Sequence, residues 1–464
     1  MASLAGMLQA QGHRITGSDM ASYPPMSDLL AELGIEVKQP YDLRNLEPRP
    51  DLVVVGNAIS RGNAELEYVL DHRIPFASMA AILHDEFLAG RQPLVVAGTH
   101  GKTTTTSMLA WIYEVAARQR PELAPSFLIG GVAENFGTSF RVAATSPFII
   151  EGDEYDTAFF DKGPKFLHYF PDAAILTHVE FDHADIYPDL EAVKTAFKRL
   201  VNLIPRRGLL VAYDGSDTVS ECVSRAFCRV ERYGFREGSE WRIAQLRHQG
   251  TTTRWTLTRG GSLFAELSLP MAGEHNALNA TAAAALAAGR GIATEAIVEA
   301  LASFRSVKRR LEVRAEVDGI TIIDDFAHHP TAIRETLRAL KESYSGRRLW
   351  AVLEPRSNTL RRNVFETPLV ESLGIADRVV LSAVFKSESI PIAERLKPET
   401  IVSRLIAGGV PSVAVADADA VVAELAPQLK TGDVVAILSN GGFGNIYEKL
   451  PNALAAMRLP AAVR

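Results

Sequence analysis

The sequence is poor in features that would mark a specialised class of protein. Its 464 residues include only two cysteines, Cys222 and Cys228. That number predicts neither a disulfide framework nor a cysteine-based metal site, and it suits a reducing cytoplasm. No apolar run approaches 18 residues, so we expect no membrane-spanning helix and no membrane partner. The first residues, "MASLAGMLQAQGHR", carry no positive segment before a short apolar stretch, so a signal peptide is not expected.

An excess of positive charge is also lacking, since the formal net charge is −6. Nucleic-acid binding usually leaves a basic signature, so we expect no nucleic-acid partner. The composition is 47% hydrophobic and 22% charged, which is typical of a globular enzyme. The length predicts about three domains. Together these features predict a multidomain cytoplasmic enzyme, either a monomer or a weak homo-oligomer.

Three segments of the chain differ in pattern. Residues 1–88 alternate β runs such as "DLVVVGNAI" with helical patterns such as "AELEYVLDH", and "LAGRQP" then supplies turn residues. Residues 89–308 begin with "PLVVA" and a glycine-containing loop, and later form the alternating pattern of an antiparallel β meander. An alanine-rich helix follows, which we expect Gly289 to end. Residues 309–464 alternate five β runs with helices, as in a Rossmann-like sheet. The fold class is therefore predicted to be α/β.

The loop "GTHGKTTT" predicts phosphate binding, although it is shorter than the usual G-x-x-x-x-G-K-[ST]. Gly98 and Gly101 would let backbone N–H groups face phosphate oxygens at the start of a helix. Lys102 would reach the β- and γ-phosphates, and the Thr103 hydroxyl would ligate Mg²⁺. The sequence therefore predicts an ATP-binding protein that uses Mg²⁺.

Acidic residues follow two later β runs. Glu154 lies in "IIEGDEYDTAFFD", and His183 lies among three acids in "ILTHVEFDHADIY". Carboxylates at strand ends near a phosphate loop are typical Mg²⁺ ligands, and a neutral imidazole coordinates a divalent ion or transfers a proton. A solvated acidic loop and a structural histidine are the alternatives.

Three further motifs contain polar groups suited to ligands. His275 and Asn279 lie four residues apart on one helical face, so they would either contact an adenine edge or simply begin a helix. His328 follows the β run of "IIDDFAHHPTAI". Three arginines follow the β run that ends in "EPRSNTLRRN", and they would either hold carboxylates or phosphates or form a solvated rim.

In this order, "GTHGKTTT", the acidic strand end, "DH", "HNALNA", "RRLE" and "DDFAHHP" resemble the Mur ligase superfamily over essentially the whole chain. The resemblance implies a nucleotide-sugar domain at 1–88, a P-loop ATPase domain with a β meander at 89–308, and a Rossmann-like domain at 309–464. It also implies ATP-dependent joining of a carboxylate to an amine through an acyl phosphate. "GTHGKTTT" and "DDFAHHP" resemble the branch that uses UDP-N-acetylmuramate. "FFDKGPKF", "EPRSNT" and "SNGGFGNI" resemble members whose acceptor is the murein tripeptide L-Ala-γ-D-Glu-meso-diaminopimelate, recovered in peptidoglycan recycling.

The resemblance also implies roles for individual residues. The catalytic residues would be Lys102, Glu154 and His183, and the Mg²⁺ ligands Thr103, Glu154 and His183. ATP would be bound by Gly98, Thr99, His100, Gly101, Lys102, Thr103 and Thr104, with His275 and Asn279 at the adenine, and Arg310 and Asp325 at the phosphate and ribose. The UDP-sugar and peptide would be bound by Asn135, Thr138, His328, Arg356, Ser357 and Asn358.

The sequence departs from this family pattern at two places. Members of the branch begin with a strand and a Gly-rich loop, whereas "MASLAGMLQAQGHR" resembles the helix that follows them. We therefore expect the N-terminal domain to lack that strand and loop, which puts UDP affinity in doubt. Many members also carry a carbamylated lysine, but neither Lys194 nor Lys198 aligns with it securely, so no modification is assigned.

Three other functions fit parts of the pattern. The nearest is the UDP-N-acetylmuramate:L-alanine ligase of peptidoglycan biosynthesis, and the "FFDKGPKF" segment argues against it. A P-loop kinase would release a phosphorylated product and would not need two further α/β domains. A non-catalytic nucleotide-binding scaffold would not need Lys102, Glu154 and His183 together.

Overall fold

Buried apolar runs in the middle of the chain form a ten-stranded sheet in the computed structural model, which describes residues 1–22 and 26–458. β5 (Gln92–Ala97) lies between β8 (Pro147–Gly152) and β11 (Ala173–Leu176), and all three are parallel. Because helices cover both faces, these strands are apolar throughout instead of alternating. The parallel order continues through β12 (Leu209–Tyr213) and β13 (Arg229–Gly234) on one side and β6 (Ser126–Ala133) on the other, and antiparallel β7 (Thr138–Arg141) closes that edge.

Two groups of helices enclose this sheet. α5 (Lys102–Ala117), α8 (Glu274–Gly289) and α9 (Thr294–Ala302) cover one face. The small side chains of the alanine-rich α8 let it pack closely, and nearly all of them are buried. The other face is covered by α6 (Leu190–Leu203), α7 (Asp217–Val223), α4 (Met79–Leu83) and α1 (Ala2–Ala10). Leu4 and Met7 of α1 therefore share a core with the central sheet.

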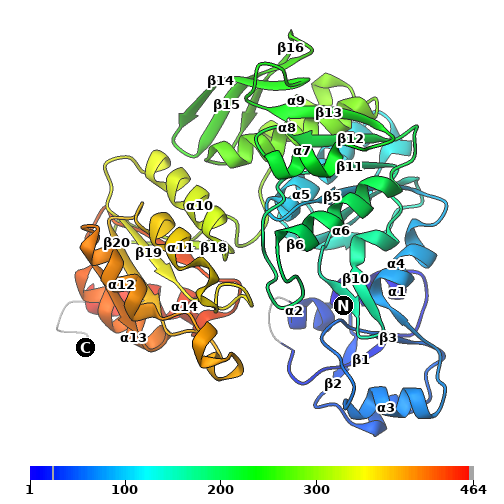
Figure 1. The fold of residues 1–464 in the computed structure, drawn as a ribbon, viewed down its shortest axis with the longest axis horizontal. Helices are drawn as coiled ribbons and strands as arrows, with labels where there is room; N and C mark the ends of the chain where they lie inside the picture. Colours follow the sequence, from blue (N-terminus) through cyan, green and yellow to red (C-terminus); the bar gives the residue numbers. More distant parts are fainter. Residues whose placement is uncertain (23–25, 459–464) are drawn as a thin grey trace.

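The predicted antiparallel meander is present. β14 (Trp241–Gln249), β15 (Thr252–Arg259) and β16 (Ser262–Leu269) pair in sequence order and extend the sheet at the top of Figure 1. The buried indoles of Trp241 and Trp255 attach it to the core.

The alanine-rich helix ends at Gly289, as the sequence predicts. Gly289 is the last helical residue of α8, and the left-handed residue after the helix is Gly291, with φ 83°. A Cβ atom at Gly289 would lie 2.4 Å from Cδ2 of Leu209. Glycine is therefore needed at 289 for close approach to β12, and the chain turns two residues later.

The N-terminal segment contains short strands in two separate pairs. β1 (Thr16–Ser18) pairs with β2 (Glu36–Lys38), and β3 (Val53–Val55) pairs with β4 (Phe76–Ser78), both in parallel. α2 (Met26–Glu32) and α3 (Ala64–Asp71) lie beside them. The sequence predicts one α/β sheet here, but within residues 1–22 and 26–88 the two pairs do not join. Alternation of apolar residues predicts that a strand exists and not which strand it pairs with.

The C-terminal segment forms the predicted doubly wound sheet. Its parallel strands, in spatial order, are β18 (Ile320–Asp325), β22 (Val434–Leu438), β19 (Leu349–Leu353), β20 (Arg378–Ser382) and β21 (Ser412–Val415). β17 (Glu312–Val317) adds an antiparallel edge strand that the sequence did not predict, because its side chains are only partly buried. One face is covered by α10 (Pro330–Ser343), α11 (Glu366–Leu373) and α12 (Pro398–Ala407), the other by α13 (Ala418–Leu425) and α14 (Ile446–Arg458).

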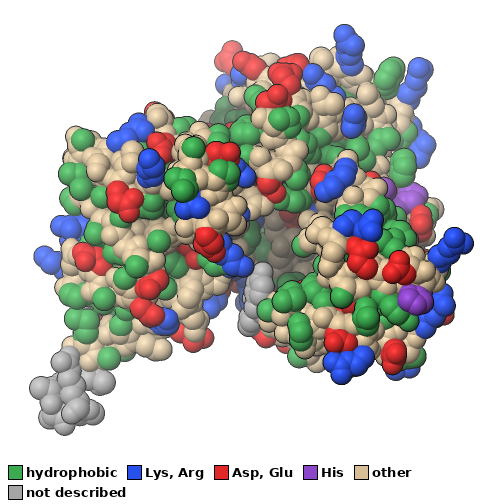
Figure 2. Space-filling model, turned by 60° about the horizontal axis from the view of Figure 1, so that its bottom comes forward, with side chains coloured by type: hydrophobic (Ala, Val, Ile, Leu, Met, Phe, Trp, Pro, Cys, Tyr) green, Lys and Arg blue, Asp and Glu red, His purple; other side chains and the backbone are tan. Residues whose placement is uncertain are grey.

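Figure 1 shows the C-terminal body apart from the other two parts, with α10 facing the central body, whereas the N-terminal part adjoins the central body and shares a core with it. Figure 2 shows a deep recess between the C-terminal body and the rest of the molecule. Among the described residues, no helix is long and apolar enough to cross a membrane. The ends of β5, β8 and β11 carry the polar residues that the sequence singles out, and these face the C-terminal body.

Candidate active site

The phosphate loop makes a tight turn between β5 and α5. Gly98 and Gly101 adopt positive φ angles of 128° and 80°. A Cβ atom at Gly98 would lie 2.2 Å from Oγ1 of Thr177, and one at Gly101 would lie 2.4 Å from Oδ1 of Asn279. Both glycines are therefore required by conformation and by contact, and the loop packs against α8, where the predicted adenine residues lie.

Lys102 lies at the start of α5 with 14% of its side chain exposed, and its ammonium group makes three polar contacts. Its Nζ donates to the carbonyl oxygens of Gly98 at 2.7 Å and Thr99 at 3.3 Å, and to Oε1 of Glu154 at 2.9 Å. Burial by itself lowers the pKa of Lys102, but the carboxylates of Glu154 and Glu151 outweigh it and the pKa is raised. The side chain is a fixed positive charge between the loop and the acids after β8.

Glu154 connects the loop to His183. Its Oε1 also lies 3.1 Å from Nε2 of His183, whereas its buried Oε2 has no hydrogen-bond partner among the described residues. Burial lowers the pKa of His183, but its hydrogen bond with Glu154 and the nearby charge of Asp182 reverse the shift and raise it. The three predicted catalytic side chains are therefore in direct contact, and one carboxylate oxygen remains available.

Thr103 contacts a glutamate that the sequence analysis did not select. Its hydroxyl donates to Oε1 of Glu151 at 3.0 Å, and the other oxygen of Glu151 accepts from the N–H of Gly130 at 2.8 Å. Burial raises the pKa of Glu151. The feature of the sequence that could have identified Glu151 is its position at the end of β8, in the same acidic segment as Glu154.

A cavity of about 610 Å³ lies between the central and C-terminal bodies. The buried Nδ1 of His275, which lines it, has no partner among the described residues. An unpaired buried polar atom in a cavity wall favours a polar ligand that supplies its hydrogen bond. The predicted ATP residues that line this cavity are His100, Gly101, Thr104, His275, Asn279, Arg310 and Asp325.

Arg310 and Asp325 reach this cavity from the C-terminal body. The Arg310 guanidinium lies over the ring of Phe326, 5.1 Å from its centroid, and 3.5 Å from the Thr103 hydroxyl. Asp325 accepts from the N–H of Leu311 at 2.8 Å and from the N–H of Ala327 at 2.9 Å. Asp325 thus holds the cavity wall in shape, and Arg310 spans the two bodies.

Replacing His275 with alanine is expected to raise the KM for ATP about tenfold and to leave kcat nearly unchanged. The reason is that His275 lines the cavity and is not part of the Lys102 group. Its loss would weaken binding in the ground state and the transition state equally, which raises KM and leaves kcat unchanged. Steady-state kinetics at saturating second substrates would measure it. His248→Ala, on the meander, is the matched control, and a fall in kcat without a change in KM would contradict the adenine assignment.

Residues of the "EPRSNT" segment in the C-terminal body contact the central body. Asn358 donates to the hydroxyl oxygen of Tyr155 at 2.9 Å and to Oδ2 of Asp185 at 2.8 Å. The next residue, Thr359, donates to Oδ1 of Asp182 at 2.6 Å. Asn358, predicted to contact the peptide, therefore connects the C-terminal body to the loops after β8 and β11.

The neighbours of Asn358 are engaged within the C-terminal body. The Ser357 hydroxyl donates to the carbonyl oxygen of His328 at 3.3 Å, and Nδ1 of His328 donates to the carbonyl oxygen of Phe326 at 2.8 Å. The Arg356 guanidinium stacks over Phe385, 3.7 Å from the ring centroid. Their role in peptide binding remains a prediction.

Replacing Asn358 with alanine is expected to lower kcat roughly tenfold with little change in thermal unfolding, since it removes hydrogen bonds that form only when the two bodies meet. Stopped-flow turnover and a melting curve would measure both effects. Asn363→Ala is the control because Asn363 donates only within the C-terminal body, to the carbonyl oxygen of Ala393. Equal kcat for the two variants would contradict this role.

The two weaker candidates for the UDP-sugar lie outside the cavity. Asn135 accepts from the N–H of Arg305 at 2.7 Å and donates to the carbonyl oxygen of Ser303 at 3.1 Å. Both ends of its amide thus hold the segment that leads into the C-terminal body. Thr138 begins β7 and pairs with Ala133. The structure therefore gives Asn135 a structural contact and does not bring either residue to the cavity lining.

Glu180 and Asn276 also line the cavity, and neither was predicted from the sequence to bind ATP. Glu180 follows β11 and accepts from the Thr331 hydroxyl at 2.7 Å. Asn276 is buried one turn before Asn279 and donates to the carbonyl oxygen of Ala272 at 2.7 Å. Both lie in the motifs "VEFDH" and "HNALN", but only the fold shows which motif residues face the cavity.

Comparisons with known proteins identify the class. The chain matches the Mur ligase family catalytic domain at 1–90, the Mur ligase middle domain at 96–287, and the Mur ligase glutamate ligase domain at 309–441. The chain belongs to the Mur ligase family, and it is an ATP-dependent ligase.

Individual relatives show which members of the family the chain is similar to. The chain is 41% identical over 456 residues to the Escherichia coli K12 UDP-N-acetylmuramate–L-alanyl-γ-D-glutamyl-meso-2,6-diaminoheptandioate ligase, covering 98% of this chain and 96% of that protein. It is 33% identical to the UDP-N-acetylmuramate–L-alanine ligase of Geotalea daltonii, covering 97% and 93%. The crystal structure of a murein peptide ligase from Psychrobacter arcticus matches with a TM-score of 0.75 and 35% identity, covering 99% of this chain and 97% of that one.

Proposed function

We propose that the protein joins the lactyl carboxylate of UDP-N-acetylmuramate to the amine of the tripeptide L-Ala-γ-D-Glu-meso-diaminopimelate, with ATP converted to ADP and phosphate. The observation that carries the proposal is the 41% identity, over 98% of the chain, to a relative named for this reaction. Identity to the relative named for L-alanine is lower, at 33%. The role would be the reuse of peptidoglycan fragments.

A short hairpin supports the choice of acceptor. The segment "FFDKGPKF" begins directly after β9 (Asp156–Ala158) and contains the turn, β10 (Asp161–Pro164), which pairs with β9, and the start of the next turn. Phe160 packs edge-on against Phe76 of the N-terminal body, with ring centroids 5.1 Å apart, and Lys165 pairs with Asp153 at 2.6 Å. The hairpin therefore joins the acidic segment of Glu154 to the N-terminal body, where a sugar nucleotide is expected.

Lys102 and its neighbours suit the first step. A lactyl carboxylate oxygen attacks the γ-phosphorus, the bond from that phosphorus to the bridging oxygen of ADP breaks, and an acyl phosphate forms. Two anions must approach one another, so the buried ammonium of Lys102 offsets their repulsion. Arg310, at the cavity and 3.5 Å from the Thr103 hydroxyl, adds positive charge from the C-terminal body.

The site also fits Mg²⁺. The Thr103 hydroxyl, the unpartnered Oε2 of Glu154 and the imidazole of His183 are the side chains that would hold it. A buried carboxylate oxygen without a partner is costly unless a cation or donor is bound, so the donor set matches an oxygen-preferring ion. Bound there, Mg²⁺ would neutralise phosphate charge during transfer.

The second step forms the amide. The tripeptide amine attacks the acyl carbon, the bond from carbon to the phosphate oxygen breaks, and phosphate leaves while the amine loses a proton. Acyl phosphates hydrolyse readily, so water must be kept out until the amine arrives. The contacts of Asn358 with Tyr155 and Asp185 close the C-terminal body over this region.

The proposal is tested by offering either the tripeptide or L-alanine with ATP, Mg²⁺ and UDP-N-acetylmuramate, and by following ADP and the UDP product. ADP release with a UDP-muramyl-tripeptide, and little alanine adduct, is expected. A preference for alanine would instead assign the biosynthetic reaction, which the Geotalea daltonii relative represents.

A further inference from the structure

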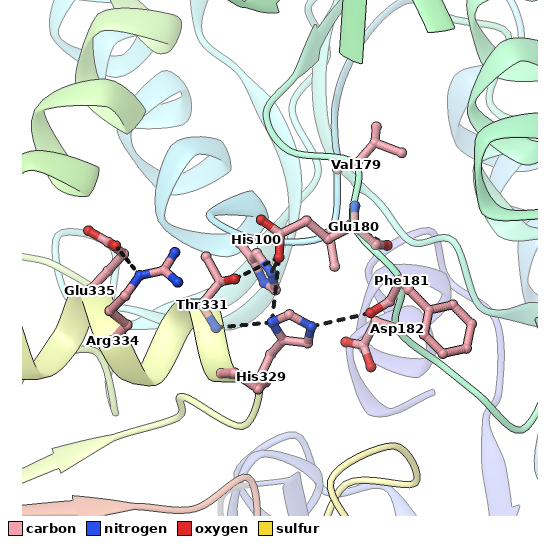
Figure 3. Close-up of polar contacts among 12 residues, drawn as sticks. His100, Val179, Glu180, Phe181, Asp182, His329, Thr331, Arg334 and Glu335 are labelled. Atoms are coloured by element: carbon pink, nitrogen blue, oxygen red, sulfur yellow. Dashed lines mark hydrogen bonds and ion pairs between the residues drawn. The ribbon is translucent and has the colours of Figure 1, made fainter. Parts of the chain in front are cut away.

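Three metal-ligating side chains meet beside the nucleotide cavity, apart from the Lys102, Glu154 and His183 group. They are His100 of the phosphate loop, Glu180 after β11, and His329 at the N-cap of α10, and Figure 3 shows them pointing toward one another. Oε2 of Glu180 lies 3.3 Å from Nε2 of His100 and 3.7 Å from Nδ1 of His329. One ligand atom from each residue lies within 4.8 Å of the others. A carboxylate thus sits between imidazoles from two bodies.

The hydrogen bonds of His329 fix which ring nitrogen carries a lone pair. Nε2 lies 3.2 Å from the carbonyl oxygen of Phe181, which only accepts, so Nε2 carries the proton. Nδ1 accepts from the N–H of Thr331 at 3.3 Å. Oε2 of Glu180 lies 3.7 Å from the same nitrogen. A metal ion bound here would take the Nδ1 lone pair in place of the long hydrogen bond from Thr331.

The donor set is one that Zn²⁺ uses. Two imidazoles and one carboxylate bind this ion in catalytic zinc sites, with the fourth position open. Nε2 of His100 lies 3.3 Å from Oε2 of Glu180, and a bound ion would replace that direct contact.

The geometry fits such an ion. Zinc bonds of about 2.0–2.1 Å arranged tetrahedrally place ligand atoms about 3.4 Å apart. The two separations from Oε2 of Glu180, 3.3 and 3.7 Å, lie close to that value, and the two imidazole nitrogens lie within 4.8 Å of each other. The Thr331 hydroxyl donates to Oε2 of Glu180 at 2.7 Å, so both the carboxylate and the His329 ring are oriented by outer hydrogen bonds. The positive end of α10 opposes a cation, and the charges of Glu180 and Asp182 offset it.

We propose that His100, Glu180 and His329 bind one divalent transition-metal ion, best matched by Zn²⁺, which bridges the central and C-terminal bodies. Access is from the cavity, since 32% of the Glu180 side chain is exposed whereas that of His329 is 6% exposed. The ion would tie the phosphate loop to the first turn of α10. This site is distinct from the oxygen-rich group around Glu154, and its occupancy does not depend on the acceptor that the ligase uses.

Calorimetric titration of the EDTA-treated full chain with Zn²⁺, in excess Mg²⁺, tests the site. The unchanged protein is expected to bind one more Zn²⁺ than His329→Gln, or to bind Zn²⁺ more than about 100-fold more tightly. A difference of that size exceeds the loss of metal affinity caused by removing a residue that only hydrogen-bonds to a ligand. Glu180→Gln is expected to behave like His329→Gln, although its amide still accepts from Thr331. His178→Gln is the matched control, since its ring lies 6.2 Å from that of His100 and outside the cluster.

Two further readouts separate a metal site from a merely structural contact. Co²⁺ should give a visible absorption band of a four-coordinate ion in the unchanged protein and in His178→Gln, and none in His329→Gln. Zn²⁺ should raise the unfolding temperature of the same two proteins, because a ligand that binds only the folded state stabilises it. Equal Zn²⁺ stoichiometry and affinity in all four proteins, or no Co²⁺ band in the unchanged protein, would overturn the proposal.

Discussion

Lys102→Met is expected to lower kcat by about 10²- to 10³-fold, the effect of removing one preorganised charge from a phosphoryl-transfer site. Lys102 is buried, and its ammonium group contacts both the phosphate loop and Glu154. Methionine keeps the length of the side chain and removes the charge that brings the carboxylate and the γ-phosphate together. ADP release with saturating substrates would measure the loss.

Lys165→Met is the matched control for that substitution. Lys165 is also a buried lysine paired with an acid of the same segment, Asp153, at 2.6 Å, but it lies outside the loop. Both variants lose an ion pair in which the lysine is largely buried, so both are expected to unfold at lower temperature. If Lys165→Met lost as much activity as Lys102→Met, general destabilisation would explain the result and the catalytic role would be wrong.

Glu154→Gln is expected to lower kcat about 100-fold and to raise the Mg²⁺ concentration needed for half-maximal activity. The amide is nearly isosteric, so the contact with Lys102 can persist, but the carboxylate charge available at Oε2 is lost. Titration of activity with Mg²⁺ at fixed ATP would measure both effects.

The matched control is Glu231→Gln, which neutralises a buried glutamate that accepts from Nε1 of Trp241 at 2.7 Å in the meander. That variant is expected to keep the Mg²⁺ dependence of the unchanged protein. Unaltered Mg²⁺ dependence in Glu154→Gln would remove Glu154 from the proposed ligand set.

The sequence predicted much of the fold because its buried strands are continuous apolar runs. β5, β8, β11 and the five parallel C-terminal strands were recognisable in this way, and so was the alternating meander. The pairing of the three-residue N-terminal strands was not, since short strands carry little pattern. The end of α8 at Gly289 was predicted, but the close approach of Gly289 to Leu209 was not, because it depends on tertiary contact.

The residues of the candidate site were also only partly predictable from the sequence. Lys102, Glu154 and His183 were selected from motifs, and the structure brings them into contact. Glu180 was passed over although it belongs to the same motif as His183, because its partners, His100 and Thr331, come from distant parts of the chain. The assignment of Asn358 to the peptide stays a prediction, and its contact with Tyr155 in another body could not be predicted from a local motif.

The most direct test of the proposed reaction is one incubation in which UDP-N-acetylmuramate carries ¹⁸O in its lactyl carboxylate, with ATP, Mg²⁺ and equal amounts of tripeptide and L-alanine. Mass spectrometry would then measure the nucleotide product and the released phosphate. We expect a UDP-muramyl-tripeptide and one ¹⁸O in the phosphate, since an acyl phosphate transfers a carboxylate oxygen to phosphorus. A product that carries alanine, or phosphate without ¹⁸O, would contradict the account.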